Sequence, residues 1–165
     1  MSDITPIEST PRGGPLPASF GQQRLWFLAQ MFPGDPSYNE PLMVPLVGPV
    51  DAAALARSLT EITRRHEAWR TVFTSADGQP MQEIRPPSPF SLTLIDLTSL
   101  PPEEREPEAK RLSLNDTRRP FDLREGPLVR ALLIRLSDTD SRLIVTAHHI
   151  IMDGCSYWQF LLPEL

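Results

Sequence analysis

The segment TAHHIIMDGCS, residues 146–156, brings together most of the residues of this sequence that are suited to proton transfer. Two of the three histidines, His148 and His149, are adjacent, and Asp153 and Gly154 follow closely. A histidine titrates at about pH 6.5, which suits general acid or base catalysis near neutral pH, and an aspartate can orient it. The pattern indicates either a proton-transfer site or the buried end of a core strand that runs into a turn.

Strand geometry separates the two histidines, because successive side chains of a β-strand point to opposite faces. One histidine should therefore face the core and the other a cleft. Gly154 is expected to permit a sharp turn into the next helix, and Asp153 to lie near the histidines or to hold the loop through an ion pair. Arg65 and Arg70, on the strongest predicted helix, are the candidates for that pair, since a buried bidentate Arg–Asp contact fixes geometry.

Other kinds of site are open to the same residues. A metal site would need His66 as a third ligand, and Cys155 has no paired cysteine or histidine at zinc-finger spacing, so no metal is expected. Cys155 as a nucleophile follows no nucleophile-elbow pattern. Two adjacent histidines alone are a weak signal. The residues by themselves therefore favour a core strand end with incidental histidines over catalysis.

Composition narrows the class of protein. The chain has 165 residues, 40% of them hydrophobic, which is enough for one domain with a real core. Its net charge of -5 gives no broad basic surface for nucleic acid, and no apolar run is long enough to cross a membrane. A single cysteine excludes an internal disulfide, and the first residues lack the pattern of a signal peptide. We expect a cytoplasmic protein.

The remaining segments are expected to build the elements that position this site. Residues 1–17 are rich in Pro, Gly, Ser and Thr and are predicted to be a linker, with the folded part over 18–165. The patterns predict a helix over 19–32 capped by Ser19, an edge strand over 41–50, and a helix opened by Asp51 whose apolar stripe runs to Trp69. A strand–turn–strand around Asp77-Gly78 and a strand over 90–97 are expected next. The last predicted elements are a surface helix over 101–121, a hairpin over 127–150 and a helix from 156. This order predicts an α+β fold, a mixed β-sheet with helices packed on it.

Three segments resemble the condensation domains of nonribosomal peptide synthetases. AHHIIMDG (147–154) resembles the HHxxxDG motif of that family. SFGQQRLWFL (19–28) is similar to its block SxAQxRLWxL, and RHEAWRTVF (65–73) to its block RHExLRTxF. The resemblance runs from about Pro17 to the last residue and keeps the order of the blocks.

The resemblance implies a fold like that of chloramphenicol acetyltransferase, with two similar lobes in a V and a tunnel between them. Such domains join a donor aminoacyl or peptidyl thioester to the amine of an acceptor. Both substrates are carried on the 4'-phosphopantetheine arms of donor and acceptor peptidyl carrier proteins, and no cofactor is bound directly. This chain corresponds to the N-terminal lobe, and the C-terminal lobe is absent. We therefore expect a piece of a longer synthetase.

The resemblance also assigns roles to residues. His149 matches the catalytic histidine, either as a base or as a residue that orients the amine, and His148 matches the structural one. Asp153 matches the motif aspartate, which in relatives pairs with the arginine that Arg65 matches. Gly154 matches a glycine whose backbone lies near the reacting carbonyl. Arg70 matches a second arginine that supports the site.

Two alternatives remain open at this point. The isolated lobe is catalytically silent and only docks a carrier protein, or the same fold performs epimerisation or acyl transfer to a free amine or alcohol.

Overall fold

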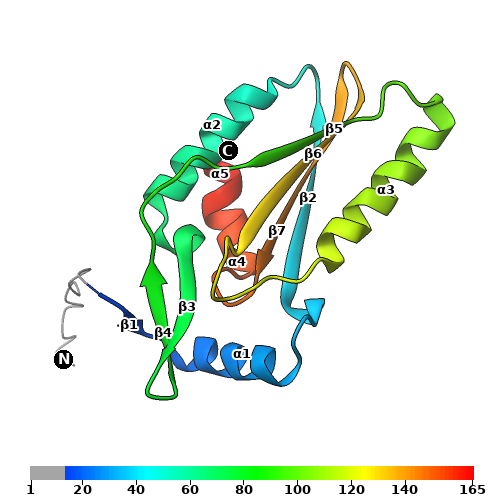
Figure 1. Cartoon of the computed structure of the whole chain (residues 1–165). Helices are drawn as coiled ribbons and strands as arrows, with labels where there is room; N and C mark the ends of the chain where they lie inside the picture. Colours follow the sequence, from blue (N-terminus) through cyan, green and yellow to red (C-terminus); the bar gives the residue numbers. More distant parts are fainter. Residues whose placement is uncertain (1–13) are drawn as a thin grey trace, which may run out of the picture.

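A four-stranded mixed sheet forms the centre of the chain, in the computed structural model that describes residues 14–165 (Figure 1). Its strands, in their order across the sheet, are β2 (Asn39–Val47), β7 (Asp140–His148), β6 (Val129–Ser137) and β5 (Leu92–Asp96). β2, β7 and β6 are antiparallel, and β5 is parallel to β6. β6 and β7 form the long hairpin that the sequence predicted.

A second, three-stranded sheet was not expected. It consists of β1 (Leu16–Pro17), β4 (Gln79–Ile84) and β3 (Thr71–Ala76) in the order β1-β4-β3. The predicted linker thus includes two residues that pair with β4, while residues 1–13 lie outside the described part of the chain. The turn between β3 and β4 is confirmed, since Asp77 and Gly78 both have positive φ, as a tight hairpin requires.

Local sequence signals determine where the helices begin. α1 (Phe20–Met31) starts at Ser19, whose side chain accepts from the backbone N–H of Gln22 in a capping box. α2 (Ala52–Arg65) starts at Asp51, whose carboxylate accepts from two backbone N–H groups of the first turn. α3 (Pro102–Arg118) starts with a proline and two acidic residues, and a short 3-10 turn, η1 (Pro36–Tyr38), precedes β2.

The helix opened by Asp51 ends earlier than its apolar stripe suggested. α2 stops at Arg65, and η2 (Glu67–Arg70), a 3-10 turn, leads directly into β3. The β-branched and aromatic run after Trp69 favours the strand. Trp69 is buried nevertheless, and Arg70 lies on η2 and not on α2.

Helices cover both faces of the four-stranded sheet (Figure 1). Alternate residues of β6 and β7 point to opposite faces. Leu133 and Val145 pack against α2 and the C-terminal helical segment, whereas Ile134 and Ile144 pack against α3. Each face of the sheet therefore has its own core cluster, and β7 is buried along most of its length.

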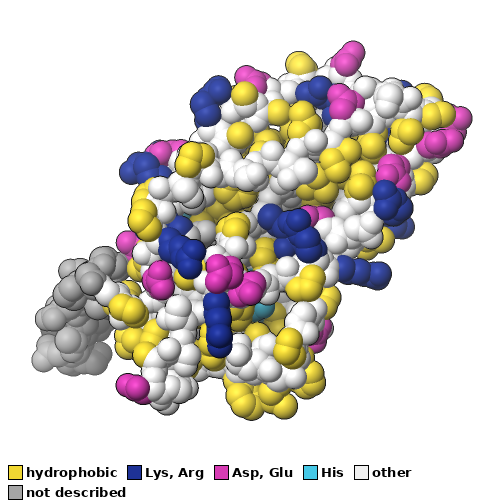
Figure 2. All heavy atoms as spheres, in the orientation of Figure 1, with side chains coloured by type: hydrophobic (Ala, Val, Ile, Leu, Met, Phe, Trp, Pro, Cys, Tyr) yellow, Lys and Arg dark blue, Asp and Glu magenta, His cyan; other side chains and the backbone are white. Residues whose placement is uncertain are grey.

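A third cluster lies where the two sheets meet. Leu25 and Trp26 of α1 pack with Phe73 of β3 and with Ile150, directly after the histidine pair. The chain then runs through α4 (Gly154–Ser156), a π-helical turn η3 (Tyr157–Leu161) and α5 (Leu162–Glu164). None of the helices within residues 14–165 is long and apolar enough to cross a membrane. Figure 2 shows acidic and basic side chains intermixed on one face, without a broad basic surface.

Candidate functional site

The end of β7 places the two adjacent histidines on opposite sides of the chain, as strand geometry predicted. His148 is only 5% exposed, and its ring lies beside the rings of Tyr38 and Phe121. The His149 side chain is 39% exposed and lines a cavity of about 470 Å³. The pair therefore divides into one buried and one accessible imidazole.

Hydrogen bonding determines the tautomer of His149. Its Nδ1 lies 3.1 Å from the backbone oxygen of Met152, and a carbonyl can only accept. Nδ1 therefore carries the proton, and the neutral ring keeps its lone pair on Nε2. The carboxylate of Glu40 on β2 lies 3.4 Å from the same Nδ1. This arrangement can hold the ring in place while Nε2 accepts a proton.

The cavity beside His149 lies between α1 and the loop that follows β7. Gln22 of α1 connects the two elements, because its Nε2 donates to the backbone oxygen of Ile150 and to the side chain of Gln82 on β4. The α1 residues that line the cavity, with the cap of that helix, are Ser19, Gly21, Gln22, Arg24 and Leu25.

Asp153 stabilises the loop through a cap and not through an arginine. Its Oδ1 accepts from the backbone N–H of Ser156 at 2.9 Å and from the Ser156 hydroxyl at 2.7 Å. These hydrogen bonds, that of the hydroxyl first, lower the pKa of the Asp153 carboxyl.

The expected ion pair between Asp153 and Arg65 is wrong for this structure. Arg65 pairs with Glu61 at 2.8 Å and reaches Glu164 at 3.7 Å. The physical reason is proximity: Glu61 stands one helical turn before Arg65 on α2, and Glu164 belongs to α5, which packs against α2. Arg65 therefore lies beside Glu61 and Glu164 and not beside the histidine loop.

Arg70 and Gly154 also differ from expectation. Arg70 donates to the backbone oxygen of Arg85 and lines another cavity, so the structure does not bring it to His149. Gly154 does not have positive φ, and a Cβ added there would meet nothing within 4 Å. The turn therefore does not depend on the conformational freedom of glycine, and the space above Gly154 is open.

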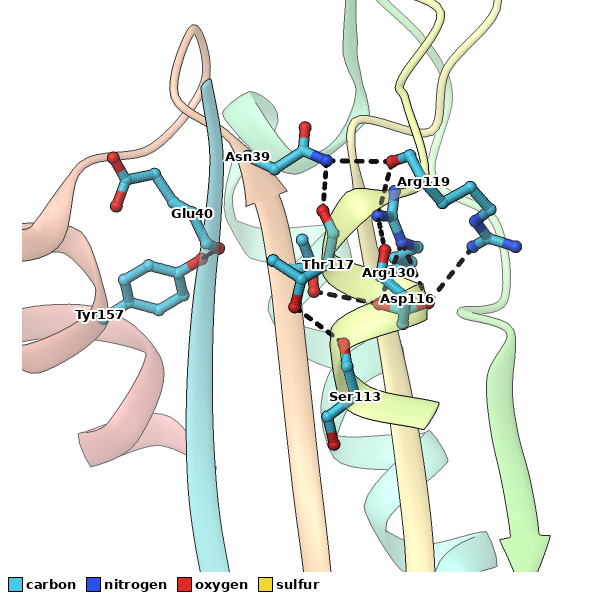
Figure 3. Close-up of polar contacts among 9 residues, drawn as sticks. Asn39, Glu40, Ser113, Asp116, Thr117, Arg119, Arg130 and Tyr157 are labelled. Atoms are coloured by element: carbon cyan, nitrogen blue, oxygen red, sulfur yellow. Dashed lines mark hydrogen bonds and ion pairs between the residues drawn. The ribbon is translucent and has the colours of Figure 1, made fainter. Parts of the chain in front are cut away.

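A buried polar network supports the histidine strand from the side of α3 (Figure 3). Arg130 of β6 and Asp116 of α3 form an ion pair whose side chains are 10% and 14% exposed. Thr146 of β7 donates to the same carboxylate at 3.0 Å, and Arg130 also donates to the backbone oxygens of Asp116 and Arg119. The Arg130 guanidinium lies 4.0 Å from the ring centroid of Phe121, which contacts His148 edge-on.

The other side of β7 is held through β2. Asn39, which pairs with His148, donates to the backbone oxygens of Thr117 and Arg119 (Figure 3). Tyr157 donates to the backbone oxygen of Glu40, and burial raises the pKa of its phenol. These hydrogen bonds fix the position of β2 relative to α3 and to the helical segment that follows residue 153.

Sequence reasoning missed Glu40 and the carbonyl of Met152 as partners of His149. Glu40 pairs with Ala147 in the β2–β7 ladder, so only the register of that ladder places it near His149. A backbone carbonyl carries no sequence signal at all.

Within residues 14–165, no group of three or more His, Cys, Asp or Glu side chains is arranged to hold a metal ion. His66 contacts Glu164 at 2.9 Å, and Cys155 is exposed.

Comparisons with known proteins all indicate the same family. A family model described as a condensation domain matches residues 14–165. The chain is similar to one of the proteins that form the linear gramicidin synthase of Brevibacillus parabrevis, with 45% identity over 157 residues, covering 95% of this chain and 2% of that protein. It is also similar to the phosphinothricin tripeptide synthetase PhsC of Streptomyces viridochromogenes, with 47% identity, covering 87% of this chain and 13% of that protein.

Solved structures share the fold. The starter condensation domain of rhizomide synthetase RzmA superimposes with a TM-score of 0.81 at 24% identity, covering 88% of this chain and 35% of that chain. The first condensation domain of the calcium-dependent antibiotic synthetase, in complex with substrate analogue 2a, gives a TM-score of 0.80 at 27% identity, covering 87% and 34%. The chain thus spans about a third of these structures and a small part of the synthetases.

The Asp116–Arg130 pair generates a stability prediction. Asp116→Asn leaves the Arg130 charge buried without its counter-charge, so we expect a loss of about 3–5 kcal/mol in the free energy of unfolding, measured by urea denaturation. Asp96→Asn is the matched control, because the pair between Asp96 and Arg135 is much more exposed. An equal loss in both variants would contradict a special role for the buried pair.

Burial of His148 generates a pH prediction. Burial, with a smaller effect of His149, lowers the pKa of His148 from 6.5 to about 4, and its Nδ1 accepts from the backbone N–H of Ile150. Between these values the unfolded chain binds the proton and the folded chain does not. Stability is therefore complete above about pH 6.5 and falls towards pH 4, by up to about 3 kcal/mol.

The difference between the wild-type chain and His148→Gln isolates this contribution, measured by urea denaturation from pH 4 to pH 7.5. The variant should lose less stability across that range. Parallel curves for the two proteins would show that His148 does not contribute to the pH dependence.

Proposed function

Because the chain belongs to the condensation-domain family, we propose that it is the lobe of such a domain that carries the histidine motif and that it takes part in peptide-bond formation. The observation that carries the proposal is the environment of His149. The imidazole lies on a cavity wall, its Nδ1 is held by the Met152 carbonyl, and its Nε2 keeps a lone pair. A side chain held in this way suits a group that receives or directs a proton.

The proposed reaction joins two substrates carried as thioesters on the 4'-phosphopantetheine arms of carrier proteins. The amine nitrogen of the acceptor attacks the thioester carbonyl carbon of the donor, and the carbon–sulfur bond breaks as the peptide bond forms. The amine gives up a proton and the departing thiolate gains one, so a group that relays a proton between them balances the step. His149 is that group, or it holds the amine in line.

The neighbours of His149 have supporting roles in this proposal. Asp153 keeps the loop in shape by capping α4, and His148 keeps the strand end buried. The open space over Gly154 leaves room for the reacting carbonyl close to the backbone. Glu40 lies 3.4 Å from Nδ1, where its carboxylate can help to hold the ring in place.

Arg65 and Arg70, which the resemblance assigned to the site, take no direct part in the proposed reaction. Arg65 lies near Glu164 of α5 and does not pair with Asp153. Arg70 has no part at His149, because it lines a different cavity.

A second candidate function has its own support. Since the chain spans only about 35% of the RzmA condensation domain, the tunnel of the family needs a second lobe that this chain does not include. The 165 residues alone would then dock a donor or acceptor carrier protein without catalysing transfer.

Transfer is tested by the intact mass of an aminoacyl-loaded acceptor carrier. It is incubated with a loaded donor carrier and either the 165-residue chain or a chain extended through the second lobe. We expect transfer by the extended chain and a decrease of about 100- to 10,000-fold in His149→Ala, the range typical of general base catalysis. His66→Gln is the matched control, because His66 lies outside the cavity that His149 lines.

Unchanged transfer in His149→Ala would overturn the role proposed for His149. Transfer by the short chain, lost in the same variant, would show that one lobe suffices.

Docking without catalysis is tested by NMR. Addition of an unlabelled carrier protein to the ¹⁵N-labelled 165-residue chain should shift amide signals in a saturable manner. An unchanged spectrum at millimolar carrier would remove the second candidate.

A further inference from the structure

A second cavity, of about 540 Å³, lies away from His149, between η2, the connection from β4 to β5 and the start of β6. Figure 2 shows Lys and Arg side chains beside Asp and Glu side chains in the middle of one face of the molecule. Four arginines line the cavity together with two aromatic rings: Arg70, Arg85, Arg119, Arg130, Trp69 and Phe90.

Arg70 presents an unused donor in this cavity. Its side chain is only 16% exposed, and its Nε is buried without a hydrogen-bond partner among residues 14–165. Nη1 donates to the backbone oxygen of Arg85 at 2.6 Å, and Nη2 lies 3.8 Å from Glu67, beyond hydrogen-bond distance. Protein atoms cover Nε, so an acceptor that a ligand brings would meet Arg70 at Nη2.

The other arginines add positive charge around the same space. Arg85 donates to the backbone oxygens of Arg124 and Glu125, and its Nε lies 3.8 Å from the Glu83 carboxylate. Arg119 is 64% exposed and lies 3.7 Å from Asp116, whose carboxylate is already shared with Arg130. An anion entering the cavity therefore meets guanidinium groups that have only distant or shared counter-charges.

The remaining wall limits the kind of anion. Trp69 and Phe90 stand with ring centroids 5.9 Å apart, and three prolines continue the apolar surface: Pro86, Pro89 and Pro127. Glu125 also lines the cavity, and its negative charge disfavours a doubly charged ligand. A guanidinium matches the planar geometry of a carboxylate, and the rings and prolines match an apolar body.

We propose that this cavity binds a monocarboxylate with an apolar body about the size of an aromatic ring, its carboxylate accepting from Nη2 of Arg70 and its body lying against Trp69 and Phe90. The site is separate from the cavity of His149, and the proposal does not rest on peptide-bond formation. Its test is a binding measurement, so failure of either proposal leaves the other standing.

The probe is phenylacetate, titrated into the ¹⁵N-labelled 165-residue chain at low ionic strength. Phenylacetamide is the neutral control of nearly the same shape, and inorganic phosphate supplies charge without an apolar body. We expect saturable shifts of the Arg70 Nε–H and Trp69 indole N–H signals with phenylacetate. Each control should bind more weakly by about tenfold or more, because phenylacetamide lacks the negative charge that strengthens a hydrogen bond from a guanidinium, and phosphate lacks the apolar body.

Variants assign the binding to the arginines. Arg70→Gln should weaken phenylacetate binding by about tenfold or more, and Arg119→Gln, at an exposed position that tolerates change, by about two- to threefold. Arg57→Gln removes a similar charge from an exposed position on α2 that does not line the cavity and should bind like wild type.

The proposal is overturned if phenylacetate causes no saturable shift at Arg70 or Trp69, or if phenylacetamide or phosphate binds equally well. Equal binding by the Arg57 and Arg119 variants would also count against it, and this comparison remains available if Arg70→Gln fails to fold.

Discussion

The ion pair between Asp116 and Arg130 is the contact on which the geometry of the histidine strand depends. It joins the C-terminal turn of α3 to β6, and through Thr146 it also reaches β7. Arg130 uses its remaining donors on the carbonyls at the end of α3, so the charge is surrounded by acceptors and not merely paired. A buried pair satisfied in this way fixes a geometry more than it adds stability. Here the geometry is that of His148, which contacts the Phe121 ring beneath the guanidinium.

The different environments of the two histidines follow from that support. His148 is enclosed and its pKa is lowered, so it remains neutral and accepts a backbone hydrogen bond at neutral pH. His149, one residue further, emerges on the other side, where the Met152 carbonyl and the Glu40 carboxylate both lie near Nδ1. The buried ring anchors the strand end and the exposed ring faces the cavity. Neither position is available without the β2–β7 pairing that ends at Asn39 and His148.

Trp69 separates two different environments. It packs in the main core, contacts Phe90 on the side of the arginine-lined cavity, and also lines the small space beside Met152 behind the histidine loop. Arg70, the next residue, consequently turns away from His149. The two arginines of the segment RHEAWRTVF thus lie in separate places. Arg65 is near Glu164 of α5, and Arg70 lines the second cavity.

Patterns that act over a few residues were readable in the sequence alone. The N-cap at Ser19, the cap at Asp51, the Asp77-Gly78 turn and the opposite orientation of His148 and His149 all depend on local backbone geometry, and the structure has each of them. The α+β class followed from the order of those elements. Tertiary structure alone decided which distant residues meet: Glu40 reaches His149 through strand register, Arg65 reaches Glu164 and not Asp153, and Leu16–Pro17 joins a separate sheet. The physical reason is that side-chain period and capping are set by neighbours in the chain, whereas register and ion-pair choice are set by packing between elements far apart in it.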